Sequence, residues 1–284
     1  MAQLLVSPIS YIRYARKSKL ALFAVLWMAA IAIMAIFPFV IAPHPPNRTF
    51  SGKSNLPPSL EFLLGTDNVG RDILSQVIWG ASTSLAIGIG AAMVEVVIGV
   101  PLGLFAGYYG GRLDQIFMRI ADTILTIPTI VLLIVAVTLL RAQSLVSIVI
   151  VMGFVNWVWL AKTLRGEALR VREEEYVTAA KAMGFSDPYI IAKHILSNVV
   201  APLIVIVTFD IAWFILYEST MSFIGLGDPT IPSWGRLLFI GRGFLNTAPW
   251  ISVIPGIFIF LTVLSFNILG DDLTGFLGAR GRRV

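Results

Sequence analysis

The sequence predicts an all-α integral membrane protein with six transmembrane helices and a cytoplasmic helix–turn–helix loop. Of its 284 residues, 57% are apolar and only 13% are charged, whereas a soluble domain carries about 25% charged residues. Six apolar runs are long enough to cross a bilayer, which takes about 20 residues of helix. Between two of these runs lies a charged segment of residues 161–200 that carries its own helix and turn signals.

The apolar runs define the expected spans. They are Leu20–Ile41, Thr83–Tyr108, Ile116–Leu140, Ser144–Leu160, Ala201–Tyr217 and Trp250–Leu269. The first run follows several basic residues but is too long for a signal peptide and lacks a cleavage site, so we expect a retained helix. Pro128 is expected to interrupt the third span and Pro255 the sixth. Glycines in the second span allow another helix to approach closely.

The distribution of basic residues predicts the orientation. Six spans place both termini on one side, and that side carries 15 of the 21 Lys and Arg residues, against 6 on the other. Cytoplasmic loops are enriched in Lys and Arg, so we expect both termini and the charged segment in the cytoplasm. The net charge of +5 then needs no nucleic-acid partner, and no basic stretch is interleaved with aromatics.

The same topology divides the chain. Residues 1–19 form a cytoplasmic N-terminal segment, and residues 20–284 form one transmembrane domain. Within that domain, external loops are expected at about 42–80 and 218–249, and the cytoplasmic loop at about 161–200.

The charged segment has a specific local pattern. Ala180 and Gly184 are four residues apart and Ala179 adjoins them, so they predict a helix with a face of small residues. Gly184 is expected to end this helix in the left-handed conformation. Asp187 and Pro188 predict an N-cap and first position of a second short helix. A loop that only joins two membrane helices needs no such helix and turn signals, so we expect another protein to dock on this segment.

Enzymatic chemistry finds little support in the sequence. There is no cysteine, the two histidines are isolated, and the one Gly-Lys-Ser run, residues 52–54, lacks the first glycine of a phosphate-binding loop. We therefore expect no catalytic, cofactor-binding or metal-ligating residue, and any ATP hydrolysis in a separate chain.

Four acidic residues lie in or near the expected spans. Glu95 and Asp210 are the most deeply placed, Asp122 lies near the cytoplasmic boundary, and Glu218 lies near the external one. Charges at this depth usually face a bundle interior or a water-filled path. A structural or pathway-lining role is favoured. An ion-coupled secondary transporter that uses Glu95 or Asp210 is the alternative.

The charged segment resembles the EAA loop of permease subunits in ATP-binding-cassette importers. The match consists of Thr178-Ala179-Ala180, then Gly184, then residues 194–198. Two positions depart from the family pattern, since Thr178 replaces the usual Glu and Ser197 the usual Pro.

Two external motifs narrow the resemblance to the dipeptide, oligopeptide and nickel branch, and within it to the C-type permease. The first comprises Gly65, Thr66, Asp67, Gly70, Arg71 and Asp72, and the loop before the last span contributes Gly225, Gly227, Trp234 and Gly235. The resemblance covers nearly the whole chain from about residue 10.

The resemblance implies a type I importer permease fold in the cell membrane. Such a chain would form half of a translocation pathway for peptides or a related solute such as nickel or an oligosaccharide. Its partners would be a homologous sister permease, an external solute-binding protein and two ATPase subunits, which hold the ATP and Mg. Ala179, Ala180 and Gly184 would contact a groove on an ATPase, and ATP-driven closure would switch the spans between inward- and outward-open states.

Overall fold

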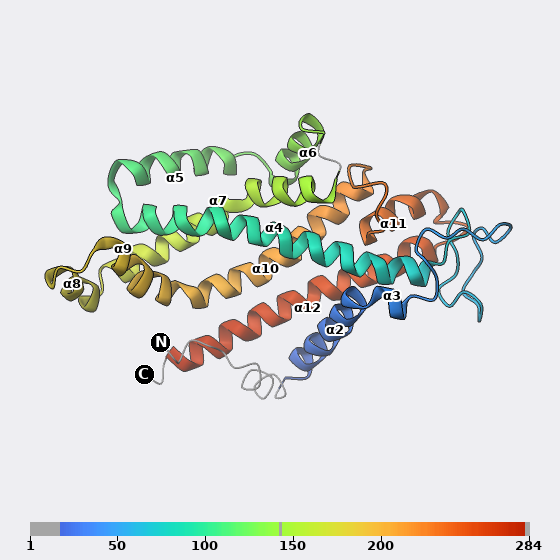
Figure 1. Ribbon diagram of the computed structural model, residues 1–284, viewed down its shortest axis with the longest axis horizontal. Helices are drawn as coiled ribbons and strands as arrows, with labels where there is room; N and C mark the ends of the chain where they lie inside the picture. The colour runs from blue at the N-terminus through green and yellow to red at the C-terminus, as the bar shows by residue number, and fades with distance from the viewer. Residues whose placement is uncertain (1–17, 142–143, 282–284) are drawn as a thin grey trace.

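Long helices run side by side through the molecule (Figure 1). The computed structural model describes residues 18–141 and 144–281, with side chains up to Phe276. Residues 1–17 of the expected N-terminal segment lie outside these ranges. In the described part, the secondary structure is helical apart from two isolated β-bridges, Thr49–Arg71 and Thr66–Asp72. The helices are α2 (Lys19–Ile36), α3 (Pro38–Ile41), α4 (Ile73–Tyr109), α5 (Gly111–Leu125), α6 (Thr129–Leu139), α7 (Leu145–Arg172), α8 (Glu175–Ala182), α9 (Asp187–Ile190), a π-helical turn (Ile191–Ile195), α10 (Leu196–Phe223), α11 (Trp234–Gly241), a 3₁₀ turn (Arg242–Phe244) and α12 (Trp250–Gly281).

The expected membrane spans are present, and the interruption expected at Pro128 in the third span is confirmed. Five helical stretches are long and apolar enough to cross a bilayer, and the pair α5–α6 makes a sixth if it counts as one span. These two helices meet at 91°, because Pro128 has no N–H to continue a helix and disfavours helical geometry in the residue before it. The expected interruption at Pro255 is wrong, since α12 continues through it.

Several helices extend beyond the bounds that hydropathy predicts. Helix α4 begins at Ile73, ten positions before the expected Thr83, because the Asp72 carboxylate accepts a hydrogen bond from Ser75 N at 3.1 Å and caps the helix. Helix α7 continues to Arg172, and one helical stretch runs from Asp187 to Phe223. The external loop therefore ends at residue 72, and only residues 173–186 lie between the long helices. The prediction of a separate second short helix in the charged segment is wrong, because α9 continues through the π-helical turn into α10.

Helices α4 and α7 pack at close range along a row of glycines. A Cβ added at Gly103 would lie 2.6 Å from the Ala161 carbonyl oxygen, and one at Gly107 would lie 2.7 Å from that of Arg165. Both distances are shorter than a carbon–oxygen contact allows. The expected role of glycine in the second span, close helix approach, is thus confirmed at these two positions.

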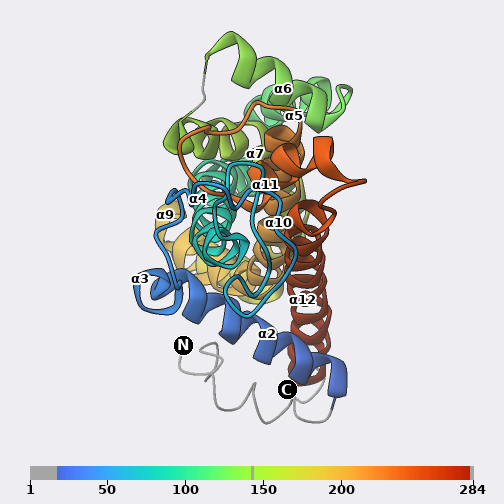
Figure 2. The same ribbon diagram turned by 90° about the vertical axis from the view of Figure 1, so that its right-hand side faces the viewer.

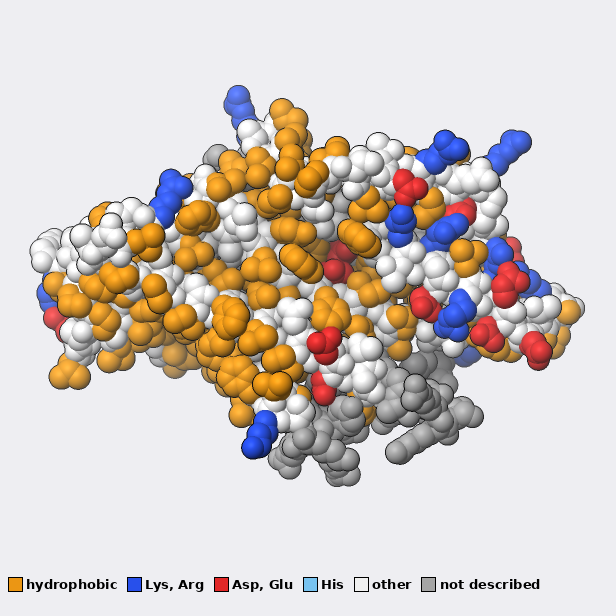
Figure 3. Space-filling model, turned by 180° about the vertical axis from the view of Figure 1, so that it is seen from behind, with side chains coloured by type: hydrophobic (Ala, Val, Ile, Leu, Met, Phe, Trp, Pro, Cys, Tyr) orange, Lys and Arg blue, Asp and Glu red, His pale blue; other side chains and the backbone are white. Residues whose placement is uncertain are grey.

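The two ends of the molecule differ. Helix α8 projects at one end, whereas α11 and the loop of residues 42–72 lie at the other (Figure 1). In the end-on view of Figure 2, α4 lies in the middle of the bundle. Apolar side chains cover the middle of the surface in Figure 3, and charged side chains gather mainly at the α8 end. This arrangement fits a bilayer around the middle of the bundle.

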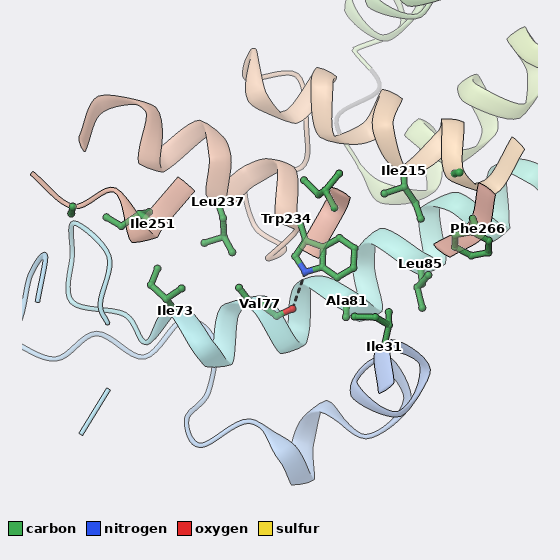
Figure 4. Close-up of a cluster of buried hydrophobic side chains, with 13 residues drawn as sticks. Ile31, Ile73, Val77, Ala81, Leu85, Ile215, Trp234, Leu237, Ile251 and Phe266 are labelled. Atoms are coloured by element: carbon green, nitrogen blue, oxygen red, sulfur yellow. Dashed lines mark hydrogen bonds between the residues drawn. The ribbon is translucent and has the colours of Figure 1, made fainter. Parts of the chain in front are cut away.

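The core at the α11 end is built around one indole ring. Trp234 is fully buried and donates a hydrogen bond from Nε1 to the Val77 carbonyl oxygen at 3.0 Å (Figure 4). Side chains from α2, α4, α10, α11 and α12 meet in the same cluster. A Cβ at Gly80 would lie 2.8 Å from the Trp234 ring, so glycine makes room for the indole.

Candidate functional site

The first candidate site is the turn that follows α8. Gly184 has a φ of +81°, and two hydrogen bonds close the turn, from Gly184 N to Lys181 O at 3.0 Å and from Phe185 N to Ala180 O at 3.2 Å. This pair of bonds is the Schellman arrangement, which satisfies carbonyls at the end of a helix. The predicted left-handed ending at Gly184 is therefore confirmed.

One face of α8 is buried against the ends of the long helices. Val177 and Ala180 are 0% and 2% exposed and pack in a cluster with Leu164 of α7 and Ile190 of α9. The expectation that Ala180 presents a surface to another protein is wrong, because this residue fills the chain's own core. Ala179, in contrast, is exposed.

The opposite face of α8 and the turn after it carry exposed apolar side chains. We call this group the α8 surface: Tyr176, Ala179, Met183, Phe185 and Tyr189. Met183 is 70% exposed, and the rings of Phe185 and Tyr189 stack with centroids 4.9 Å apart. Burial and the nearby Glu174 carboxylate raise the pKa of Tyr176, so the phenol stays neutral. A compact apolar surface within charged surroundings is typical of an interaction site.

Polar contacts join this region to the end of α4. The Tyr108 hydroxyl donates to Asp187 Oδ1 at 2.7 Å, and Lys181 Nζ lies 4.7 Å from the centre of the Tyr108 ring. Arg172 donates from Nη1 to the Tyr108 carbonyl oxygen at 3.1 Å. An open cavity of about 520 Å³ lies among these residues. The expected N-cap role of Asp187 is wrong by one position, because Ser186 is the N-cap, and Pro188 falls in the first turn of α9.

The second candidate site is the external motif before α4. Asp67 is fully buried and its Oδ1 accepts hydrogen bonds from Val69 N at 3.0 Å and Arg71 N at 2.8 Å. Its Oδ2 accepts from Arg71 Nε at 2.6 Å and Gln76 Nε2 at 3.1 Å. One carboxylate therefore organises the whole turn. The main role of the motif is therefore structural, because Asp67 holds the turn together. The sequence analysis did not predict this role.

The remaining motif residues fix the loop of residues 42–72 to the bundle. Thr66 Oγ1 donates to the Lys53 carbonyl oxygen at 2.5 Å, and the Thr66 carbonyl oxygen accepts from Trp250 Nε1 at 3.1 Å. Gly65 and Gly70 adopt positive φ angles of +79° and +82°, which glycine adopts without strain.

The loop before the last span lies beside this motif. Gly235 packs on α10, where an added Cβ would lie 2.6 Å from Ser219 Cα, and Gly227 packs against Ser222. Gly225 has a φ of +91°. Together with Trp234, these glycines place the loop directly against α10 and α4.

A cavity of about 390 Å³ opens between the two external motifs. Arg71, Arg236 and Asp228 contribute its charged groups, and Gly225 and Gly227 also line it. Burial opposes ionisation of Asp228, but hydrogen bonds from Thr230 outweigh it and hold its pKa below the usual value. Burial and the neighbouring Arg71 lower the pKa of Arg236. The two motifs are about 150 residues apart in the sequence, and the structure brings them to one surface.

The four acidic residues fall into three settings. Asp122 pairs with Lys162 Nζ at 2.5 Å on the surface of α5 and α7. Glu218 is 2% exposed and accepts hydrogen bonds from Ser222 Oγ at 2.7 Å and Ser219 Oγ at 3.3 Å. Glu95 and Asp210 lie together at a third place, a cavity within the bundle.

Fold and sites together define a multi-pass membrane permease. The chain matches the family model described as binding-protein-dependent transport system inner membrane component over residues 99–283, and the N-terminal transmembrane domain of oligopeptide transport permease C over residues 7–58. The chain belongs to this family and is the permease subunit of an ATP-binding-cassette importer. This membership favours the importer over the secondary-transporter alternative.

Curated relatives and one solved structure agree with the family. The chain is 37% identical to the dipeptide transport system permease protein DppC of Alkalihalophilus pseudofirmus, over 91% of this chain and 85% of the relative. It is 34% identical to the oligopeptide permease OppC of Bacillus subtilis, over 94% and 88%, and 37% identical to the glutathione permease GsiD of Escherichia coli, over 91% and 86%. An inward-facing structure of the MetNI methionine ABC transporter has the same fold, with a TM-score of 0.53 at 17% identity, over 70% of this chain and 96% of that one.

Sequence reasoning missed most of the α8 surface. It selected the small residues of the helix, whereas the side chains that protrude are mainly large and apolar. The buried positions Val177 and Ala180 are three residues apart, and that spacing identifies the inner face of α8. With this face assigned, Tyr176, Ala179 and Met183 would have been recognised as pointing outward.

Proposed function

We propose that this permease forms half of a translocation pathway for peptides or a related solute, and that ATPase subunits drive it through the α8 surface. Relatives that share over a third of its sequence are named for dipeptide, oligopeptide and glutathione transport. The nickel and oligosaccharide alternatives receive no comparable support from these names.

The observation that carries the coupling proposal is the connection between the α8 surface and the spans. Helix α8 follows α7 after two residues, and the turn after it leads into the continuous helix from Asp187 to Phe223. The Tyr108–Asp187 hydrogen bond adds α4. Because helices are stiff, a force applied at Met183 would be transmitted to three spans at once. Two ATPases, one on this chain and one on a homologous sister permease, would act in this way.

An external solute-binding protein would dock at the opposite end. The cavity between the external motifs offers the cations Arg71 and Arg236 together with the carboxylate of Asp228. Charges of both signs on a shaped surface favour a specific protein contact. The excess of Lys and Arg on the α8 side supports an orientation with both termini and α8 in the cytoplasm.

Single thiols test the coupling proposal cleanly, because the sequence contains no cysteine. In the complete importer, Met183→Cys should crosslink to an ATPase subunit with a maleimide–benzophenone reagent, whose maleimide binds the single thiol and whose photoreactive group needs no thiol on the partner. Ser51→Cys, an exposed residue of the external loop, is the matched control and should not. An ATPase crosslink from Ser51→Cys, or none from Met183→Cys in an assembled complex, would overturn the assignment.

A further inference from the structure

Two carboxyl groups from different helices face one cavity inside the bundle. Glu95 of α4 and Asp210 of α10 line a space of about 320 Å³, and Asn156 of α7 contributes an amide. The carboxyl groups lie within hydrogen-bonding reach of each other.

These carboxyl groups have unmet bonding capacity. Glu95 is 1% exposed, yet its Oε2 accepts no hydrogen bond, and neither does Asp210 Oδ2. Glu218, which is equally buried, has its oxygens bonded by serine hydroxyls. A buried acceptor without a donor is costly, and no Lys or Arg is among the residues that line this cavity. Beyond the contact between the two groups, Glu95 Oε2 and Asp210 Oδ2 thus remain available to a donor or cation from outside the chain.

The aromatic lining narrows the chemistry of that partner. Trp159, Trp213 and Tyr217 line the same cavity, and the rings of Trp213 and Tyr217 stack with centroids 5.9 Å apart. Aromatic faces attract organic cations, whereas a metal ion prefers additional polar ligands. Among the described residues, no group of three His, Cys, Asp or Glu side chains is placed to hold a metal. The lining thus suits an ammonium group attached to carbon.

We propose that Glu95 and Asp210 form a binding site for the protonated primary amine of the transported solute, with Trp213 and Tyr217 against its carbon atoms. The proposal rests on the proposed transport of peptides, each of which carries such an amine at its N-terminus. A cation that contacts both carboxylates also offsets the repulsion that they would otherwise exert on each other.

A thermal-shift measurement tests the site without any assumption about transport. The complete importer in lipid nanodiscs is heated with n-propylammonium chloride, with sodium chloride at the same ionic strength, or with propan-1-ol. Ligands that bind the folded state raise the unfolding temperature, so only propylammonium should raise that of the wild type. The shift should vanish in Glu95→Gln/Asp210→Asn and persist in Asp122→Asn, which removes a surface carboxylate outside the cavity. An equal shift with sodium, no ammonium-specific shift in the wild type, or a shift retained in the double variant would overturn the proposal.

A transport measurement separates this proposal from the proposed function. Proteoliposomes with the complete importer take up dialanine with ATP, and Glu95→Gln/Asp210→Asn should lower the rate about tenfold, as expected for losing a charge-assisted contact. If the wild type takes up no dialanine, that result contradicts peptide transport but not the amine site, which the thermal-shift measurement tests separately. Unchanged uptake in an assembled double variant would contradict a role for these carboxylates in the pathway.

Discussion

At the scale of single residues, glycine has two distinct roles in this permease. Gly184 and Gly225 adopt positive φ angles, whereas Gly103 and Gly107 lie in helices and allow another helix to approach. The sequence distinguishes these roles only in part. A glycine followed by Phe-Ser-Asp-Pro signals a helix end, so the left-handed turn at Gly184 was predictable. Ala180 looked equivalent to Ala179 because both are small residues, and only the spacing from Val177 distinguishes Ala180, which joins Leu164 and Ile190 in a buried cluster.

The turn after α8 provides the first prediction. Replacing Gly184 with Ala leaves its Cβ in open space but forces an L-residue to a φ of +81°, so it should cost about 1 kcal/mol of stability. Gly166→Ala is the matched control, because Gly166 lies within α7 and also has open space around it. The control should be neutral or slightly stabilising. Unfolding temperatures of the purified complex check this, and equal shifts in both variants would rule out backbone strain at Gly184.

The external motif provides the second prediction. Asp67→Asn keeps the size of the side chain but removes a buried charge that pairs with the partly buried Arg71, so it should cost about 3 kcal/mol. The control is Glu61→Gln, because Glu61 pairs with Lys53 on the surface and such pairs are worth about 0–1 kcal/mol. Thermal unfolding of both variants gives the comparison. A loss at Asp67 no larger than at Glu61 would refute its role as the hub of the turn.

At the scale of elements, hydropathy located the spans but not their ends. It finds the apolar part of a helix, whereas α4, α7 and the helix from Asp187 to Phe223 continue beyond the expected spans. Their extensions are held by contacts that hydropathy does not register, such as the Asp72 cap and the ion pairs of Arg170 with Glu167 and Glu174. The interruption at Pro128 was predicted, but its 91° angle was not, because Pro255 sits in an apparently similar context within an unbroken helix.

The contact between α4 and α7 provides the third prediction. Gly103→Ala places a methyl group 2.6 Å from the Ala161 carbonyl oxygen, so the two helices must move apart. Overpacking of this kind typically costs about 1–3 kcal/mol. Because α7 leads into α8, we also expect weaker coupling of ATP hydrolysis to uptake. The ratio of ATP hydrolysed to solute taken up measures this effect, and Gly166→Ala is again the control. A Gly103→Ala importer with normal stability and a normal ratio would contradict it.

At the scale of the whole molecule, the permease is a helical bundle with a different surface at each end. One end is capped by the loop of residues 42–72 and by α11, which are tied to the bundle through Asp67 and Trp234. The other end presents the α8 surface, and the amine site proposed at Glu95 and Asp210 lies between them. The sequence motifs predicted the two end regions, but they did not predict the cavity. That cavity arises because α4, α7 and α10 meet there, and such packing is not encoded in any local pattern.

The most direct test of the account is solute uptake by the reconstituted importer. Proteoliposomes should contain this permease, its sister permease and both ATPases, with the binding protein outside and ATP inside. We predict uptake of dialanine that requires both ATP and the binding protein and that persists when a protonophore removes the proton gradient. Uptake that proceeds without ATP and collapses with the protonophore would contradict the account and would support an ion-coupled transporter instead.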